Sequence, residues 1–206
     1  MKKLLFSLAI LCAGYFSATA QEQPKFEFGG NVGYNYSTVT STQATNSSFR
    51  SSFNVGLSAD YYFSDRWSIK TKLIYDNKGW NDGFINFEGG PNTTTNFHLS
   101  YLTIPVMANW HFGRTRNWYL NFGPYAGFLL NAKETALSAN IKQYFKSTDF
   151  GLAYGIGVKL PVSETAKINI EYDGQSGLSD IIKNNSGTSI RNARGAFNVG
   201  IIFTVN

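Results

Sequence analysis

The chain has 206 residues, which is enough for one domain and a short targeting segment. Charged residues make up only 15% of it and aromatic residues 16%, whereas about a quarter of the residues of a typical soluble domain are charged. The net charge of +5 is small and scattered, which disfavours a nucleic-acid-binding protein.

Residues 1–20 have the pattern of a secretory signal peptide. Two lysines open the chain, residues 4–13 are almost entirely apolar, and the segment ends in the small-residue sequence Ala-Thr-Ala. We predict cleavage before Gln21 and a single mature domain at residues 21–206. Because Cys12 lies in the removed segment, the mature domain is expected to contain neither a disulfide nor a thiol site.

The mature chain shows apolar residues at every second position in eight segments, the period of a β-strand. The central hairpin, residues 99–131, shows the pattern best. Its strands have the length of membrane-crossing strands, about nine to eleven residues. In chain order the segments cover residues 26–36, 53–63, 67–76, 101–112, 120–131, 150–160, 168–173 and 197–205.

Long and short connections alternate strictly between these strands. The long ones are expected at residues 37–50, 79–98, 132–149 and 174–195. In an up-and-down meander this order places every long loop at one end and every tight turn at the other. Outer-membrane barrels have the same asymmetry.

The connection at residues 132–149 has apolar residues at helical spacing. Leu137, Ile141, Tyr144 and Phe145 fit one face of a short amphipathic helix. They equally fit a loop with a few apolar anchors, and the sequence does not separate the two.

The two faces of the predicted sheet differ in character. One face is uniformly apolar, whereas the other carries charges of both signs that would cost about 2 to 4 kcal/mol each at mid-depth in lipid. We therefore predict an all-β, eight-stranded antiparallel up-and-down transmembrane β-barrel with its apolar face in lipid. The predicted lipid-facing residues include Leu102, Ile104, Val106, Leu120, Phe122, Phe128, Val199 and Ile201. The predicted charge network of the lumen comprises Glu27, Asp60, Lys70, Lys72, Asp76, Lys159, Glu171 and Asp173.

Aromatic residues gather near both ends of the predicted strands, as membrane-interface residues do. At the turn end they are Tyr61, Tyr62, Phe63, Trp67, Trp110, Phe112, Trp118 and Tyr119. At the loop end they are Tyr75, Trp80, Phe97 and Phe150.

Several motifs together resemble one family. They are YLTIPV at 101–106, GPYAG at 123–127, DFGLAYGIG at 149–157, and Glu171-Tyr172 followed by GLSDI at 177–181. With them the chain resembles the small outer membrane β-barrel proteins abundant in Bacteroidota, a group that includes PorT-like proteins and is related to OmpA-like transmembrane barrels.

This resemblance implies a location in the outer membrane and an accessory role in secretion or envelope assembly. The implied partners are outer membrane lipid and lipopolysaccharide, the barrel-assembly machinery during insertion, and an envelope or secretion protein. No nucleic acid, metal or cofactor is expected.

Only one short motif suggests catalysis. His98 and Ser100 lie two residues apart on one strand face and are similar to the His-x-Ser pair of lipid A deacylases, which are also eight-stranded barrels. Tyr101 follows where that family has Asn, and no acid is placed to orient the histidine. A rim histidine beside a strand serine is the simpler interpretation. The other histidine, His111, is expected at the membrane interface of the turn end.

Three classes of function remain open. The first is a non-enzymatic barrel that binds or scaffolds through its long extracellular loops, and the second is the secretion or envelope-assembly accessory. The third is a lipid A-modifying enzyme that uses His98 and Ser100. Basic residues near the loop end fit either lipopolysaccharide phosphates or ordinary solubilising charges. They are Arg50, Lys78, Lys133, Lys142, Lys146, Lys183, Arg191 and Arg194.

Overall fold

The computed structural model describes residues 25–41, 47–85 and 93–205, and the predicted signal peptide lies outside these residues. Eight antiparallel strands follow one another in chain order and close into a barrel, because the last strand pairs with the first. The predicted fold class is confirmed. The elements are β1 (Phe26–Thr40), β2 (Ser48–Tyr62), β3 (Trp67–Ile85), β4 (Thr93–Phe112), β5 (Trp118–Glu134), the 3₁₀ helix η1 (Lys142–Tyr144), β6 (Thr148–Pro161), β7 (Ala166–Gly177) and β8 (Arg191–Val205).

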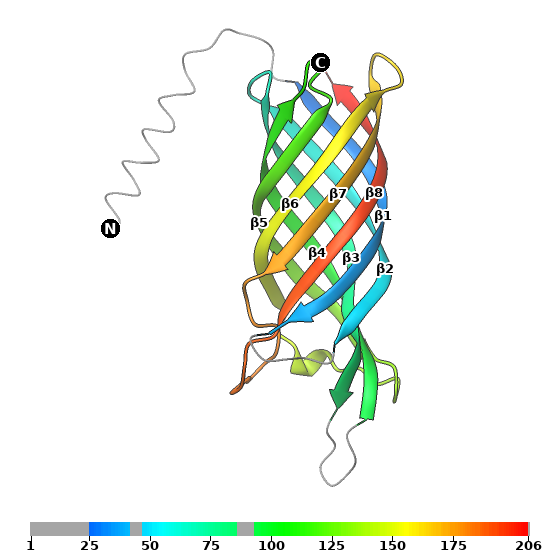
Figure 1. The fold of residues 1–206 in the computed structure, drawn as a ribbon, viewed down its shortest axis with the longest axis vertical. Helices are drawn as coiled ribbons and strands as arrows, with labels where there is room; N and C mark the ends of the chain where they lie inside the picture. The colour runs from blue at the N-terminus through cyan, green and yellow to red at the C-terminus, as the bar shows by residue number, and fades with distance from the viewer. Residues whose placement is uncertain (1–24, 42–46, 86–92, 206) are drawn as a thin grey trace, which may run out of the picture.

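The two ends of the barrel differ. The short turns lie at one end, together with the start of β1 and the end of β8, where Phe26 pairs with Val205 (Figure 1). The long connections lie at the other end, and the hairpin of β3 and β4 extends beyond the rest of the barrel there (Figure 1). We call these the turn end and the loop end.

The strands are longer at the loop end than the alternation predicts. The predicted loop at residues 79–98 contains the end of β3 and the start of β4, and the predicted loop at 174–195 contains the end of β7 and the start of β8. The apolar alternation fades there because side chains beyond the bilayer no longer need to be apolar. The backbone pairing nevertheless continues.

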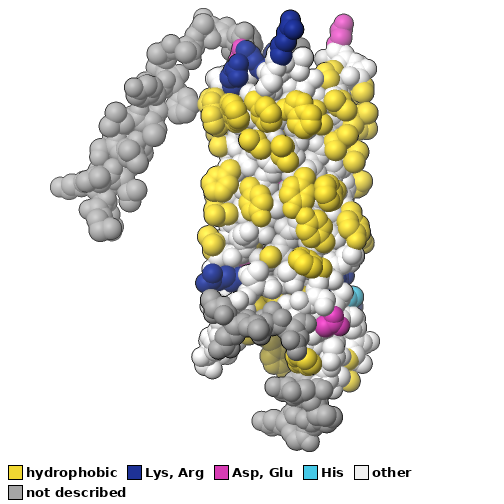
Figure 2. Space-filling model, viewed as in Figure 1, with side chains coloured by type: hydrophobic (Ala, Val, Ile, Leu, Met, Phe, Trp, Pro, Cys, Tyr) yellow, Lys and Arg dark blue, Asp and Glu magenta, His cyan; other side chains and the backbone are white. Residues whose placement is uncertain are grey.

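Apolar side chains cover the outside of the barrel between its ends, and charged side chains lie at the two boundaries of this belt (Figure 2). Phe122, on β5, exposes 57% of its surface. Leu102 and Ile104 are half-buried between neighbouring side chains but point the same way. The others of the predicted lipid-facing set, all exposed, are Val106, Leu120, Phe128, Val199 and Ile201. An exposed apolar surface of this size fits hydrocarbon and not water.

A β-bulge near the loop end shifts the facing of β5. Ser100 pairs with Asn131 and Tyr101 with Leu129, so Leu130 is the extra residue. The inward positions of β5 therefore change from odd to even numbers beyond it, and Ala132 and Glu134 are buried. A strict alternation would place Asn131 inside the barrel, but the bulge turns it to the outer face, opposite Ser100.

The segment between β5 and β6 contains only one turn of 3₁₀ helix, η1. Ile141 and Phe145 flank it and are buried, whereas Leu137 and Tyr144 are exposed. The loop with apolar anchors is thus the correct alternative. Within the described residues, no helix has both the length and the apolar character needed to cross a bilayer.

Candidate functional site

Side chains of opposite charge meet across the middle of the lumen. Lys70 of β3 donates to Glu171 of β7 at 3.1 Å, and Lys72 donates to the other oxygen of Glu171 at 2.5 Å. Lys72 also donates to Asp173 at 2.8 Å. Because β3 and β7 are on different sides of the barrel, these bonds link its opposite walls.

Arg194 extends this row toward the loop end. Its guanidinium bonds Asp173 through Nη1 and lies 3.1 Å from Asp76 through Nε. Lys78 follows, with its Nζ 3.9 Å from Asp76 and 3.4 Å from Asp149 of β6. Cations and anions alternate along the whole row, which we call the ion-pair ladder. Its members, in order, are Lys70, Glu171, Lys72, Asp173, Arg194, Asp76, Lys78 and Asp149.

A second charged cluster fills the turn end of the lumen. Lys159 of β6 donates to Glu27 at 2.6 Å, to Asp60 at 2.7 Å and to Tyr62 at 2.8 Å. Lys167 also pairs with Glu27. All the charged residues that the sequence assigns to the lumen thus lie inside the barrel, in this cluster or in the ladder.

Three turn-end residues lie inside the barrel instead of at the membrane interface. His111 is only 1% exposed, with Nε2 3.0 Å from Ser68 Oγ and 3.1 Å from Asn109 Nδ2. Its ring packs against Tyr62 at 4.7 Å between centroids, and Tyr119 is fully buried. The interface assignments of His111, Tyr62 and Tyr119 are therefore wrong, because these side chains point inward.

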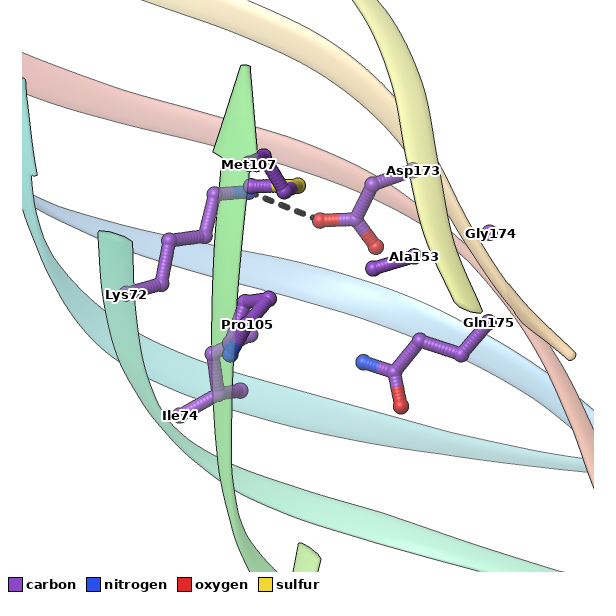
Figure 3. Close-up of a pocket in the computed structure, with 8 residues that line it drawn as sticks. All are labelled: Lys72, Ile74, Pro105, Met107, Ala153, Asp173, Gly174 and Gln175. Atoms are coloured by element: carbon purple, nitrogen blue, oxygen red, sulfur yellow. Dashed lines mark hydrogen bonds and ion pairs between the residues drawn. The ribbon is translucent and has the colours of Figure 1, made fainter. Parts of the chain in front are cut away.

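The middle of the lumen leaves little free space. A cavity of about 10 Å³ lies beside the ladder, which is room for about one water molecule. Lys72 and Asp173 bond on one side of it, and the Gln175 amide extends toward it from β7 (Figure 3). Met107 and Ala153 add apolar surface to its wall. Side chains fill an eight-stranded barrel of this kind, as its diameter requires.

The loop end of the lumen is filled differently, by a cluster of buried apolar side chains that we call the mouth plug. Trp80 and Phe97, from β3 and β4, stack with ring centroids 4.3 Å apart, and Phe145 packs on Trp80 at 6.2 Å. Trp80 and Phe97 are therefore not interface residues, because both are buried inside the mouth. The mouth plug comprises Val39, Trp80, Phe97, Leu99, Tyr101, Leu129, Ala132, Ile141, Phe145 and Ile181.

Two connections supply the outermost part of the plug. The β5–β6 segment provides Ile141 and Phe145, and the β7–β8 segment provides Ile181. The two segments are joined by a β-bridge between Phe145 and Ile182. Together these segments, residues 135–147 and 178–190, form what we call the lid.

Two carboxylates hold the lid in shape. Glu134 accepts hydrogen bonds from the backbone N–H groups of Leu137 and Ala139, both at 2.9 Å. Asp180 accepts from the backbone N–H groups of Ile182 and Ile190. Burial acts to raise the pKa of Asp180, but these hydrogen bonds and that from Asn185 outweigh it and hold the pKa below its ordinary value.

The basic residues of the loop end divide into three groups by their burial. Lys78 and Arg194 are buried members of the ladder and face no lipid or solvent, so their assignment to the loop surface is wrong. Arg50 is half-buried, and its Nη1 donates to the carbonyl oxygen of Lys78 at 3.1 Å. The remaining basic residues, all exposed, are Lys133, Lys142, Lys146, Lys183 and Arg191.

His98 and Ser100 lie on the outer face of β4, near the loop end. Ser100 Oγ donates to Asn77 Oδ1 at 2.9 Å. His98 is exposed and stands opposite Lys133 of β5. Ser100 is thus oriented by an amide and not by the histidine.

The charged lumen residues that sequence reasoning missed do have a signal. Lys78 continues the even-numbered inward positions of β3, two residues after Asp76. Arg194 lies four residues before Asn198 on the same inward face of β8, and Asp149 shares its inward direction with Ala153 on β6. Extending each alternation a few residues into the predicted loops would have identified all three.

Comparisons with known proteins agree on this architecture. A family model described as "Outer membrane protein beta-barrel domain" matches residues 19–183. No curated protein matches the chain by sequence.

Solved structures with the same fold include three bacterial outer membrane proteins. OprG from Pseudomonas aeruginosa is 15% identical with a TM-score of 0.56, and the match covers 91% of this chain and 98% of OprG. AlkL, solved in DMPC lipid bilayers, is 9% identical with a TM-score of 0.55, over 92% of this chain and 94% of AlkL. Neisserial surface protein A is 13% identical with a TM-score of 0.52, over 85% and 96%. At these identities the likeness is one of fold alone.

Proposed function

Because the chain belongs to the outer membrane protein β-barrel domain family, we propose that it is a non-enzymatic barrel whose loop end does its work at the cell surface. In this proposal the barrel anchors the lid in the outer membrane and presents it to a partner. The observation that carries it is the filled lumen. The ladder and the mouth plug occupy the interior, so the surface of the loop end is left as the working part.

The lid has an amphipathic construction that supports this proposal. Phe145 and Ile181 face the lumen and are buried, whereas Tyr144, the neighbour of Phe145 in the chain, is 60% exposed. Lys146 and Lys183 are exposed on the same two segments. A rigid barrel that holds such a surface in place is the usual arrangement for binding loops.

We propose further that the partner is a protein of secretion or envelope assembly, in keeping with the resemblance to PorT-like barrels of Bacteroidota. In the same proposal the chain is exported with cleavage before Gln21, inserts through the barrel-assembly machinery, and contacts lipopolysaccharide in the outer leaflet. An outer membrane barrel contacts membrane lipid in any case.

Complementation of a deletion strain tests this function. A triple variant of the lid surface, Tyr144→Ser with Lys146→Ser and Lys183→Ser, is compared with a control at the turn end, Arg66→Ser with Arg114→Ser. All five residues are exposed, so both variants are expected to fold. We expect the lid variant to reproduce the secretion or envelope defect of the deletion and the control to restore the wild type. Full restoration by a folded lid variant would overturn the proposal.

The deacylase alternative has a separate test. Ser100 donates its hydroxyl hydrogen to Asn77, so we expect Ser100→Ala to leave the acylation of lipid A unchanged by mass spectrometry. A loss of deacylation in this variant, with the barrel still folded, would establish the alternative.

A further inference from the structure

Two basic side chains stand side by side on the outer surface at the loop end. His98 of β4 and Lys133 of β5 are direct partners in the antiparallel ladder, and both are exposed. Directly opposed residues on one face of such a ladder have Cβ atoms about 4.5 to 5.5 Å apart. The imidazole and the ammonium group therefore belong to one small patch.

A third basic side chain is anchored at the same patch. Lys142 of η1 is exposed, and its Nζ donates to the backbone carbonyl oxygen of Leu130 at 2.9 Å. Leu130 is the bulged residue of β5, three positions before Lys133. This bond uses one of the three donors of the ammonium group, so two remain for a ligand.

The patch lies at the outer boundary of the apolar belt. On the turn-end side of the patch, Phe128 and Leu130 are 42% and 45% exposed and belong to the lipid-facing surface. A polar row follows on the same face, in which Ser100 pairs with Asn131 and bonds Asn77. The basic residues come directly after this row. This is the level at which a bilayer passes from hydrocarbon to headgroups.

These basic side chains have no acidic partner in the described part of the chain. Within residues 25–41, 47–85 and 93–205, no carboxylate oxygen lies within 4.0 Å of His98, Lys133 or Lys142. By contrast, the buried lysines of the ladder each have a carboxylate partner, as Lys72 has in Asp173. Ammonium groups left without a partner at a headgroup boundary attract anionic lipid groups, and the His98 imidazole adds an N–H donor.

We propose that His98, Lys133 and Lys142 form a binding site for a phosphate group of an outer-leaflet glycolipid, which we call the rim site. The inference rests on the proposed position of the loop end outside the cell and names the residues that would hold the lipid phosphate there. The two ammonium groups and the imidazole converge on one phosphate, and Phe128 and Leu130 pack against its acyl chains. The rim site also gives His98 a role that does not require Ser100 as a nucleophile.

Native mass spectrometry of the folded mature barrel in detergent tests the rim site. The probes are diphosphorylated lipid A and the same lipid with its phosphates removed. We expect the wild type to bind the phosphorylated lipid at least fivefold more tightly, and Lys133→Gln with Lys142→Gln to lose that preference.

The matched control removes the same charge elsewhere on the loop end. Lys146→Gln with Lys183→Gln changes two exposed lysines of the lid and is expected to keep the preference for phosphate. Equal losses in both double variants would mean a diffuse effect of net charge and would overturn the site, as would equal binding of the two lipids. Either failure leaves the proposed function standing, because the complementation test alters neither rim lysine.

Discussion

The middle of the lumen and its mouth are filled by opposite chemistries. In the middle, Lys72, Glu171 and Arg194 take part in a continuous ion-pair ladder. At the mouth, Trp80, Phe97 and other apolar side chains form a buried cluster, which Lys78 and Glu134 border. The ladder is built by the strands themselves, whereas the outermost layer of the plug comes from the two lid segments.

This difference indicates how the ladder and the mouth plug each respond to the loss of a side chain. Buried charges lose their hydration and are tolerated only when each has a well-placed partner, so the ladder resists the removal of any one member. Apolar contacts have no such requirement for geometry, so the packing of the lid on the plug depends less on exact placement than the ion pairs do. We therefore expect the lid segments to separate from the barrel before the barrel wall itself opens.

Of the changes considered, removal of Arg194 should lower the stability of the barrel most. Arg194→Met leaves Asp76 and Asp173 without the guanidinium that joins them, both at buried positions. Breaking a buried ion pair from one side costs about 3 to 5 kcal/mol. Urea unfolding of the barrel in lipid vesicles measures the loss in the free energy of unfolding.

The control for this variant lies on the same strand. Arg191 is exposed at the start of β8, and Arg191→Met is expected to change the stability by about 0.5 kcal/mol at most. Equal stabilities of the two variants would contradict the role given to the ladder.

Truncation of Phe145 should have a smaller and more local effect. Phe145 is 3% exposed in the plug, whereas its neighbour Tyr144 is 60% exposed. Removing a buried phenylalanine costs about 3 to 5 kcal/mol where nothing relaxes. Because we expect the lid to open before the wall does, Phe145→Ala should lose less than this and should increase hydrogen exchange at residues 135–147 while β4 stays protected.

The matched variant Tyr144→Ala should leave the exchange of the lid unchanged. Increased exchange throughout the strands in Phe145→Ala would show that the lid and the barrel wall open as one unit. That result would contradict the expectation that the lid separates first.

The smallest expected effect is that of acid on the lid segment at residues 178–190. The folded pKa of Asp180 lies below its ordinary value of 3.8, so its carboxylate stabilises the lid above that value. The contribution is lost as the pH falls through the lowered pKa. We expect limited proteolysis of residues 178–190 to accelerate only below about pH 4, and Asp180→Asn to flatten this dependence. Acceleration already at pH 6 would assign the effect to another group.

The amino-acid sequence alone predicts the strands of the barrel wall, but it does not predict how the mouth is packed. Alternation in segments such as residues 101–112 predicts both the strands and their outward residues, because each position depends only on its neighbours in the chain. The bulge at Leu130 breaks this rule locally, so Asn131 lies on the outer face although alternation alone would place it inside. The burial of His111 required its inward direction to be weighed above its place near a turn.

The mouth plug depends on contacts that no local pattern records. Phe145 meets Trp80, and Ile181 joins the same cluster although it is 36 residues further along the chain than Phe145. The spacing of Ile141 and Phe145 did reveal a buried face in a polar connection. The partners of this buried face are set by the closure of the barrel, which brings the two lid segments together.

Conductance in planar bilayers tests the central claim, that the lumen is filled and the work is done outside it. The mature wild type is expected to show no steady ohmic current. A variant with residues 135–147 replaced by a Gly-Ser linker should also stay silent, because the ladder still occupies the middle of the barrel. A stable open channel in the wild type would contradict the filled lumen and, with it, the function assigned to the loop end.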